Sequence, residues 1–233
     1  MNKEIFTEEL KKLNIFVTEE QLQQLDKYYK LLKEENNKYN LTAIIEENDV
    51  YLKHFYDSLT ITKLINLNNQ NICDIGAGAG FPGIVLKIIY PELKLTLIDA
   101  TTKKCNFLSL VVSELNLKNV TIINQRIEIY AQKNRECYDI VTCRAVASLK
   151  ILLELTIPLV KKDGYFIPLK GNIEKETDNI ETYYTKLNIK LIDSITFKLP
   201  FEQSTRTILK YQKQEITNPQ YPRSYNEIKK RSL

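Results

Sequence analysis

A glycine-rich stretch is the part of this sequence best suited to bind a ligand. Residues 73–83 read Cys-Asp-Ile-Gly-Ala-Gly-Ala-Gly-Phe-Pro-Gly, and the helical pattern Ile84–Ile89 follows. Glycine permits positive φ and a close approach of ligand to backbone, and N–H groups at a helix start favour anionic or electron-rich groups. Pro82 suits this place because its missing N–H costs nothing in a first helical turn. We therefore expect a ligand at this turn, over Gly76, Gly78 and Gly80.

The next apolar segment ends in an acidic residue. Leu93–Ile98 has a strand pattern, and Asp99 and Ala100 follow it about 20 residues after Gly80. In a parallel sheet this acid projects from the carboxyl end of its strand, beside the glycine turn. An acid placed there commonly accepts the ribose hydroxyls of an adenosine-containing cofactor. Asp99, with Ala100 beside it, is therefore predicted to bind a cofactor.

The glycine pattern leaves two cofactor classes open. Gly78–Gly83 fits the dinucleotide pattern G-x-G-x-x-G, which keeps a nicotinamide oxidoreductase in view. The frame that starts at Gly76 is tighter, and Asp74 precedes it; a carboxylate there can meet a cationic amino group but would repel a pyrophosphate. Asp-x-Gly-x-Gly-x-Gly with an acid ending the second strand is typical of S-adenosylmethionine-dependent methyltransferases, which we favour. A turn without a ligand is less favoured, because three spaced glycines occur here in a chain that has six.

Composition limits the remaining possibilities. The four cysteines form no C-x-x-C pair and indicate a reduced compartment, and a single histidine with no acidic cluster of ligand spacing predicts no metal site. No apolar run approaches the roughly 18 residues of a membrane span. We expect a cytoplasmic monomer without membrane contact. A formal net charge of +4 permits a nucleic-acid partner but does not require one.

The elements that position these residues fall into two regions. Residues 1–69 are predicted to form a helical extension, with helices at about 7–12, from a capping box at Thr18, and at about 48–64. Residues 70–233 are predicted to form an α/β domain with successive strand–helix units and a mainly parallel sheet. Two final strand patterns predict an antiparallel hairpin at the sheet edge, which gives the seven strands of a Rossmann-like class I methyltransferase. Strands are expected at 71–74, 94–99, 120–124, 138–143, 164–169, 189–198 and 205–211, and helices at 82–90, 102–116, 126–133 and 148–160.

Short motifs recur along nearly the whole chain, at 40–44, 54–59, 76–83, Asp99 with 103–104 and 107–108, 126–128, 143–147, 169–171 and 221–223. With these motifs the sequence is similar to the bacterial glucose-inhibited division protein B family. Two departures occur: Ala77 stands where that family often has Ser, and residues 226–233 differ from its Lys-x-Pro-Leu ending. The resemblance implies methylation of N7 of a guanine in 16S ribosomal RNA, within the small subunit or an assembly intermediate.

The resemblance also implies residue roles. Gly76 and Phe81 would line the S-adenosylmethionine pocket, Asp99 would hold the ribose, and Ile127 with Glu128 would border the adenine. Arg144, at the carboxyl end of the fourth strand, would face the methyl-transfer site. The alternatives are structural: an Arg126–Glu128 ion pair, a salt bridge of Arg144, and packing of His54 within the helical region, which we favour over a base.

Guanine N7 carries a lone pair and no proton, so the implied reaction needs no general base. Arg144 or Lys170 is the candidate catalytic residue, as a fixed donor that holds guanine O6 or a phosphate. The Asn/Asp-Pro-Pro-aromatic segment expected for an exocyclic amine is absent after the fourth strand, where Cys-Arg-Ala-Val stands instead. A small-molecule methyltransferase and a non-catalytic cofactor-binding RNA adaptor remain alternatives.

The basic C-terminal region is the best candidate for contact with RNA. Its cations alternate with Tyr211, Tyr221 and Tyr225, which are expected to stack on unpaired bases. A solvated charged face is the alternative. The predicted RNA-binding residues are Arg206, Arg223, Lys229, Lys230 and Arg231.

Overall fold

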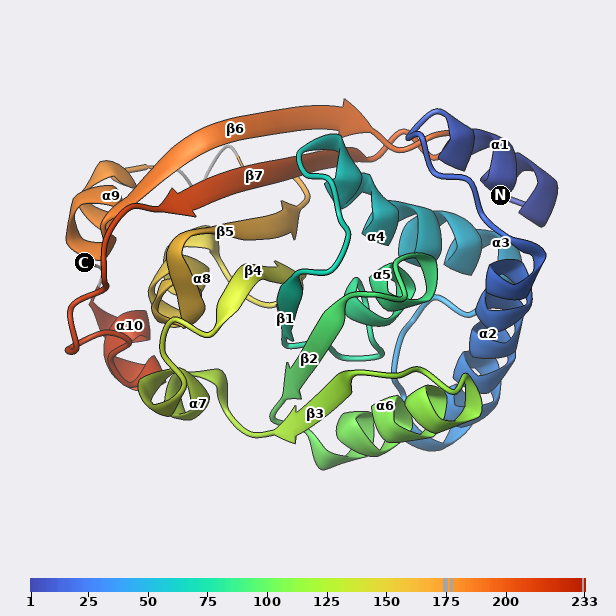
Figure 1. Cartoon of the computed structure of the whole chain (residues 1–233), viewed down its shortest axis with the longest axis horizontal. Coiled ribbons are helices and arrows are strands. Elements are labelled where there is room, and N and C mark those ends of the chain that lie inside the picture. Colours follow the sequence, from blue (N-terminus) through green and yellow to red (C-terminus); the bar gives the residue numbers. More distant parts are fainter. Residues whose placement is uncertain (174–175, 177, 232) are drawn as a thin grey trace.

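Seven strands form one sheet in the part of the chain that the computed structural model describes, namely residues 1–173, 176, 178–231 and 233 (Figure 1). They lie in the order β3-β2-β1-β4-β5-β7-β6. The first five are parallel, β7 is antiparallel to β5, and β6 is antiparallel to β7, which confirms the predicted sheet and edge hairpin. The strands are β1 (Asn71–Ile75), β2 (Lys94–Asp99), β3 (Val120–Asn124), β4 (Tyr138–Arg144), β5 (Val160–Lys170), β6 (Ile189–Lys198) and β7 (Thr205–Lys213).

Helices cover both faces of this sheet. One hydrophobic core contains Ile72 and Leu97 with side chains of the N-terminal helices, and another contains Cys73 and Ile98 with side chains of α7, α8 and α9. Neighbouring strand residues thus point to opposite faces, as the two-residue period of a strand requires. The α-helices are α1 (Lys3–Lys11), α2 (Glu19–Tyr39), α3 (Glu47–Asp49), α4 (Asp57–Leu59), α5 (Gly83–Ile89), α6 (Thr102–Glu114), α7 (Ile127–Lys133), α8 (Leu149–Thr156), α9 (Glu181–Leu187) and α10 (Tyr225–Lys230). The π-helix η1 (Val50–Tyr56) and the 3-10 helices η2 (Thr60–Lys63) and η3 (Ile157–Leu159) complete the set.

The strand order reverses at β1, which lies between β2 and β4. Ligands of open α/β sheets bind outside the carboxyl ends of the strands at such a point. The glycine turn follows β1, while Asp99 ends β2 and Arg144 ends β4. The fold therefore brings the predicted site residues of three strands to one edge of the sheet.

The N-terminal helices pack against the glycine turn. The predicted capping box of Thr18 and Gln21 starts α2. The same helix carries Tyr28, a fully buried residue whose hydroxyl donates to the carbonyl of Ala79. Because these helices share a hydrophobic core with the sheet, the boundary predicted after residue 69 marks a change of secondary structure within one core.

The structure differs from the sequence-based expectation at several elements. The helix expected at 48–64 is a run of α3, η1, α4 and η2, in which η1 is a π-helix. The helix expected at 148–160 ends at Thr156, where the 3-10 turn η3 begins with Pro158 in its first turn, and β5 starts at Val160, earlier than expected. Two short helices, α9 and α10, were not predicted. The Ser224–Glu227 capping box that starts α10 was readable in the sequence.

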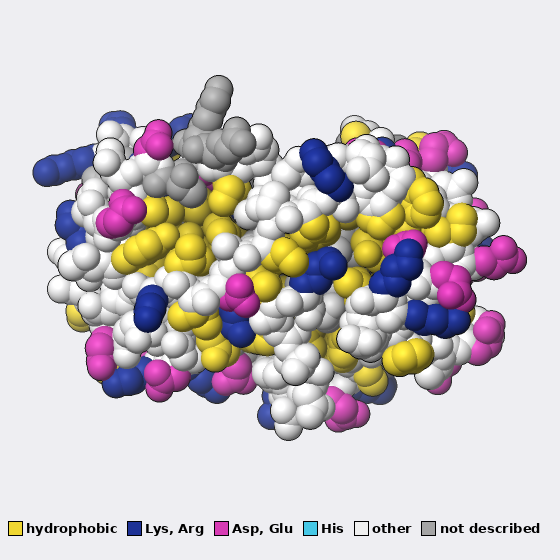
Figure 2. Space-filling view, turned by 90° about the horizontal axis from the view of Figure 1, so that it is seen from above, with side chains coloured by type: hydrophobic (Ala, Val, Ile, Leu, Met, Phe, Trp, Pro, Cys, Tyr) yellow, Lys and Arg dark blue, Asp and Glu magenta, His cyan; other side chains and the backbone are white. Residues whose placement is uncertain are grey.

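Strand β6 forms one edge of the sheet and lies at the top of Figure 1, so Figure 2, which is seen from above, looks onto this side of the molecule. Its burial alternates only weakly, and hydrophobic side chains are visible between Lys and Arg side chains on this face. Lys190 and Lys198 are exposed on the strand itself. Charged side chains of this kind discourage edge-to-edge pairing with another chain.

Candidate active site

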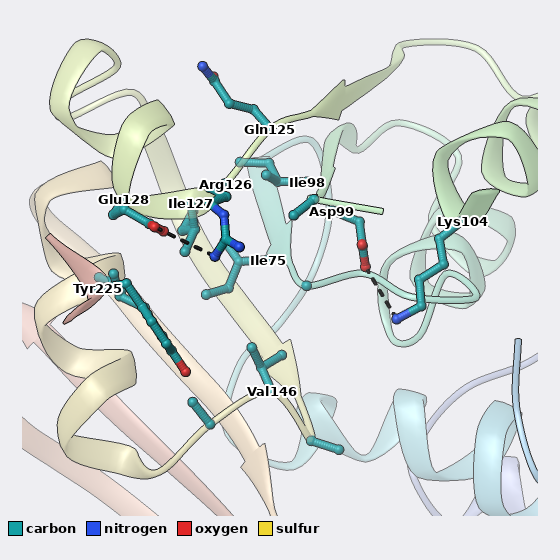
Figure 3. A pocket seen from close by; sticks show the side chains of 15 residues that line it. Ile75, Ile98, Asp99, Lys104, Gln125, Arg126, Ile127, Glu128, Val146 and Tyr225 are labelled. Atoms are coloured by element: carbon teal, nitrogen blue, oxygen red, sulfur yellow. Dashed lines mark ion pairs between the residues drawn. The ribbon is translucent and has the colours of Figure 1, made fainter. Parts of the chain in front are cut away.

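A cavity of about 280 Å³ opens at the carboxyl ends of β1, β2 and β4. It brings together five of the predicted cofactor-binding residues: Gly76, Asp99, Ala100, Ile127 and Glu128. Figure 3 shows Asp99 and Lys104 on one side of it and Arg126, Glu128 and Tyr225 on the other. Sequence reasoning gave no role in this cavity to Val146, to Lys104 or to the last described helix, which supplies Tyr225.

The carboxylate of Asp99 is fixed by backbone N–H groups. Its Oδ2 accepts from the N–H of Gly78 at 3.0 Å, and its Oδ1 accepts from the N–H of Thr101 at 2.8 Å. The Nζ of Lys104 lies 3.9 Å away. Each carboxylate oxygen has more than one lone pair, so Asp99 can hold the glycine turn and accept further hydrogen bonds from hydroxyl groups in the cavity.

The backbone of Gly76 lines the cavity at a point where a side chain would not fit. Its φ is +62°, and a Cβ built there would lie 2.7 Å from a methyl carbon of Val146. Both residues line the cavity. A side chain at position 76 would fill the cradle between the end of β1 and the segment after β4, which is why glycine is needed here.

Residues after β3 close the cavity on the far side. Glu128 is mostly buried, and its carboxylate lies 4.0 Å from the guanidinium of the exposed Arg126. The structural ion pair considered above is therefore present, although it is long. Ile127 lies between them and lines the cavity with an apolar side chain.

The other predicted cofactor-binding residues do not line this cavity. Asp74 is completely buried and accepts a hydrogen bond from the N–H of Gly83 at 2.8 Å, and burial raises the pKa of its carboxyl to about 7. Gly80 has a φ of +99°, and a Cβ there would meet the Tyr28 hydroxyl at 2.6 Å. Asp74 and Gly80 are buried within the turn, Gly78 donates to Asp99, and the contact of Asp74, Gly78, Gly80 and Phe81 with a cofactor stays a prediction.

A second cavity of about 510 Å³ adjoins the first, since Ala145 lines both. Arg144 and Lys170, the predicted catalytic residues, line this second cavity and not the first. His54 and Asp57, from the helical region, also line it. Ala145 has a φ of +55°, so the chain is in an unfavourable conformation where the cavities meet.

Arg144 is held in place from three directions. One guanidinium nitrogen donates to the carbonyl of Lys53 at 2.7 Å and to Asp57 at 3.2 Å, and the other lies 2.9 Å from Nδ1 of His54. The guanidinium carbon is 5.2 Å from the centre of the Phe81 ring. The salt bridge considered for Arg144 is thus present, at the rim of the second cavity.

His54 is buried and packed, as predicted, but its ring lies where the helical region meets the glycine turn and β4. Its ring stacks on Phe81 with centroids 4.2 Å apart, and burial and the nearby Arg144 charge lower its pKa to about 3. The ring is therefore neutral near pH 7. Since Nδ1 accepts from Arg144, the proton must lie on Nε2, which is 3.0 Å from the Thr42 hydroxyl. His54 is an acceptor that orients Arg144.

Lys170 is also engaged by the protein. Its Nζ donates to the carbonyl of Ala147 at 2.7 Å and lies 2.8 Å from the carboxylate of Glu176. Its side chain is only 9% exposed. Lys170 therefore presents a fixed positive charge at the end of β5.

Comparisons with known proteins agree with this architecture. The family model described as rRNA small subunit methyltransferase G matches residues 21–208. The chain belongs to this family. It is 45% identical over 226 residues to the ribosomal RNA small subunit methyltransferase G of Staphylococcus aureus (strain JH9), covering 96% of this chain and 95% of that protein. A Staphylococcus epidermidis protein of the same name is 45% identical over 228 residues.

Solved structures of low sequence identity share the fold of this rRNA small subunit methyltransferase G family member. A SAM-dependent methyltransferase from Aquifex aeolicus superposes with a TM-score of 0.53 at 14% identity, covering 76% of this chain and 97% of that one. M. jannaschii TYW2 in complex with AdoMet gives a TM-score of 0.52 at 19% identity, covering 64% and 71%. The predicted class I methyltransferase fold is confirmed.

Two of the cations predicted to bind RNA form ion pairs inside the protein. Arg223 binds the fully buried carboxylate of Glu154 through two nitrogens at 2.8 and 2.7 Å. Arg206 contacts both oxygens of Asp57 at 3.0 and 3.1 Å. Lys229, Lys230 and Arg231 are exposed at the end of α10, and their contact with RNA stays a prediction. Of the tail whose sequence departs from the family, Ser232 lies outside the described residues.

The expectation that the C-terminal tyrosines stack on bases is wrong for two of the three. Tyr211 is 1% exposed and Tyr221 is 6% exposed, because both belong to a hydrophobic core. Tyr225 instead lines the first cavity. Alternation of tyrosine and cations in the sequence did not distinguish a core strand from an exposed surface.

Two features are absent from the part of the chain that the structure describes. Among the described residues, no group of three or more His, Cys, Asp or Glu side chains is arranged to hold a metal ion. No described helix is both long and apolar enough to cross a membrane.

Proposed function

We propose that the protein transfers the methyl group of S-adenosylmethionine to N7 of a guanine in 16S ribosomal RNA, within the small subunit or an assembly intermediate. The family to which it belongs is named for methylation of small-subunit ribosomal RNA, which supports this substrate. The observation that carries the proposal is the pair of adjoining cavities, one with the acid and glycine of a cofactor site and one with fixed cations.

The first cavity suits the adenosine part of the cofactor. Asp99 would accept the ribose hydroxyls, Gly76 would allow close approach, and Ile127 with Glu128 would border the adenine ring. The fit rests on the cradle at Gly76, which a Cβ would fill, and on the carboxylate fixed at the end of β2. When bound, S-adenosylmethionine supplies an electrophilic methyl group on a sulfonium.

The second cavity suits the target base, because it adjoins the first at Ala145 and its arginines are held in place by Asp57 and His54. Asp57 binds two arginines, and neutral His54 accepts from one of them. Both side chains are therefore engaged by arginines, and the other carboxylates that line this cavity are Glu176, which pairs with Lys170, and Glu202. Attack by guanine N7 would need no base among these groups, since its lone pair carries no proton. Arg144 and Lys170, which present fixed charge, would hold guanine O6 or a phosphate and orient the base.

The proposal is tested by methyl transfer from labelled S-adenosylmethionine to small ribosomal subunits and to total RNA from cells that lack this protein. Nuclease digestion and nucleoside identification follow. We expect label in 7-methylguanosine from small-subunit RNA. Label in another nucleoside would contradict N7 as the target, and no incorporation despite cofactor binding would favour the small-molecule or adaptor alternatives.

Replacement of the proposed ribose acceptor tests the cofactor site. We expect Asp99→Asn to weaken S-adenosylmethionine binding by about 10- to 100-fold, because a hydrogen bond to a charged group is lost. Asp193→Asn, an exposed aspartate on β6, is the matched control. Calorimetric titration measures both, and equal affinities for the two variants would show that Asp99 does not hold the cofactor.

A further inference from the structure

The loop that joins β6 to β7 presents an aromatic ring to solvent. Phe201 lies at its tip and is 62% exposed. Its φ is +65°, in the left-handed region that a bulky side chain rarely adopts. Phe201 thus combines an unfavourable backbone conformation with an unburied apolar ring. Residues of this kind persist where function requires them.

The rest of the chain shows that this turn does not need phenylalanine. Most described non-glycine residues with positive φ are asparagines, whose short polar side chain tolerates the conformation. Asparagine would also leave no apolar surface in water. The conformation of the turn therefore does not explain why residue 201 is phenylalanine. The asparagines with positive φ are Asn14, Asn40, Asn116, Asn119, Asn179 and Asn188.

The loop is firmly attached to the wall of the second cavity. The N–H of Gln203 donates to Leu199 at 3.0 Å, and the N–H of Leu199 donates to the carbonyl of Ser204 at 3.0 Å. The guanidinium of Arg206 donates to the Ser204 hydroxyl at 2.9 Å while its Nε binds Asp57. Asp57 in turn binds Arg144. A continuous chain of hydrogen bonds thus runs from Arg144 in the second cavity to the loop.

The same loop borders the cavity. Glu202, the residue after Phe201, lines it, and so does Arg206 at the start of β7. An RNA strand that delivers a base into this cavity must pass its rim. The cations that line the cavity each pair with a carboxylate, so the exposed aromatic ring is the feature of this rim that suits an unpaired nucleotide.

We propose that Phe201 stacks on an unpaired RNA base beside the target guanosine, or enters the space that the guanosine leaves when it turns into the second cavity. This inference rests on the proposed function. Enzymes that act on a base must first remove it from its stack, and apolar side chains can enter the gap. Because the loop is held before binding, little conformational freedom is lost when the ring contacts RNA.

The test compares Phe201→Ala, Phe201→Gly and Phe201→Tyr in methyl transfer to small subunits, with melting temperatures measured for each. Phe16→Ala is the matched control, since Phe16 is 77% exposed and follows α1. We expect kcat/KM to fall about tenfold or more for the Ala and Gly variants and to change less than about twofold for Tyr and for the control. Phe201→Gly should also melt higher than the wild type, because glycine accepts positive φ.

Two results would overturn the inference. An unchanged kcat/KM in both Phe201→Ala and Phe201→Gly would show that the ring does not contact RNA. The proposed function would not be affected by that result, because it depends on RNA methylation by the wild-type protein. A loss of activity that tracks the loss of a dimer in sedimentation would assign Phe201 to a protein contact instead. Absence of RNA methylation by the wild type would overturn the proposed function itself.

Discussion

The orientation of Arg144 depends on which nitrogen of His54 faces it. Asparagine can place an acceptor near the position of Nδ1, whereas glutamine reaches the position of Nε2. We expect His54→Gln to lower kcat for RNA methylation about 10- to 100-fold, because a buried charged donor loses its acceptor, and His54→Asn to retain activity within about fivefold. Cofactor affinity should not change in either variant. Equal losses in both would indicate that only ring packing on Phe81 matters.

The protonation state of His54 gives a second prediction at this scale. Its pKa is lowered to about 3, so the neutral ring is favoured by folding and its contribution to stability is present above the unfolded value of 6.5. That contribution is lost progressively as pH falls from 6.5 toward 3. Because the chain has one histidine, its ring protons give an isolated NMR signal. We expect no titration of this signal between pH 5 and 8. A midpoint near pH 6.5 would contradict a neutral His54 ring that accepts from Arg144.

At the scale of elements, helix α2 supports the glycine turn from behind. A methyl group at Gly80 would meet Tyr28, Ile84 and Leu108, and the φ of +99° is unfavourable for alanine. We expect Gly80→Ala to lower the free energy of unfolding by about 2–4 kcal/mol, from backbone strain and overpacking. Gly171→Ala, whose nearest neighbour is 4.0 Å away, should change it by less than about 0.5 kcal/mol. Chemical denaturation measures both, and similar values would show that the turn can relax.

The sequence predicted those elements whose signals are local. Strands β1 to β4 and the capping box at Thr18 follow from apolar runs and short motifs, and so does the meeting of Gly76 with Asp99 at one edge. The ion pairs of Arg206 and Arg223 were not predictable, because their partners lie 149 and 69 residues away. Their sequence neighbours suggested a free basic surface, whereas tertiary contacts use both arginines to satisfy buried carboxylates.

At the scale of the whole molecule, three exposed cations lie at the end of α10, in addition to Lys104 and Arg126 in the lining of the first cavity. Helix α10 also supplies Tyr225 to that cavity, while α1 lies at the far end of the molecule (Figure 1). Lys229 and Lys230 are exposed in its last turn, and Arg231 follows. If these cations contact phosphates, each releases counterions, and binding weakens as salt rises.

We expect the combined variant Lys229→Gln, Lys230→Gln and Arg231→Gln to raise KM for RNA at low salt. The slope of log KM against log salt concentration should fall by about one to three. The control replaces Lys11, Lys12 and Lys30, which are exposed on the N-terminal helices and paired with acidic neighbours, so they carry little free charge. Both variants lose the same formal charge. A general effect of net charge would therefore raise KM equally in the two, whereas a phosphate contact at α10 raises it only in the first.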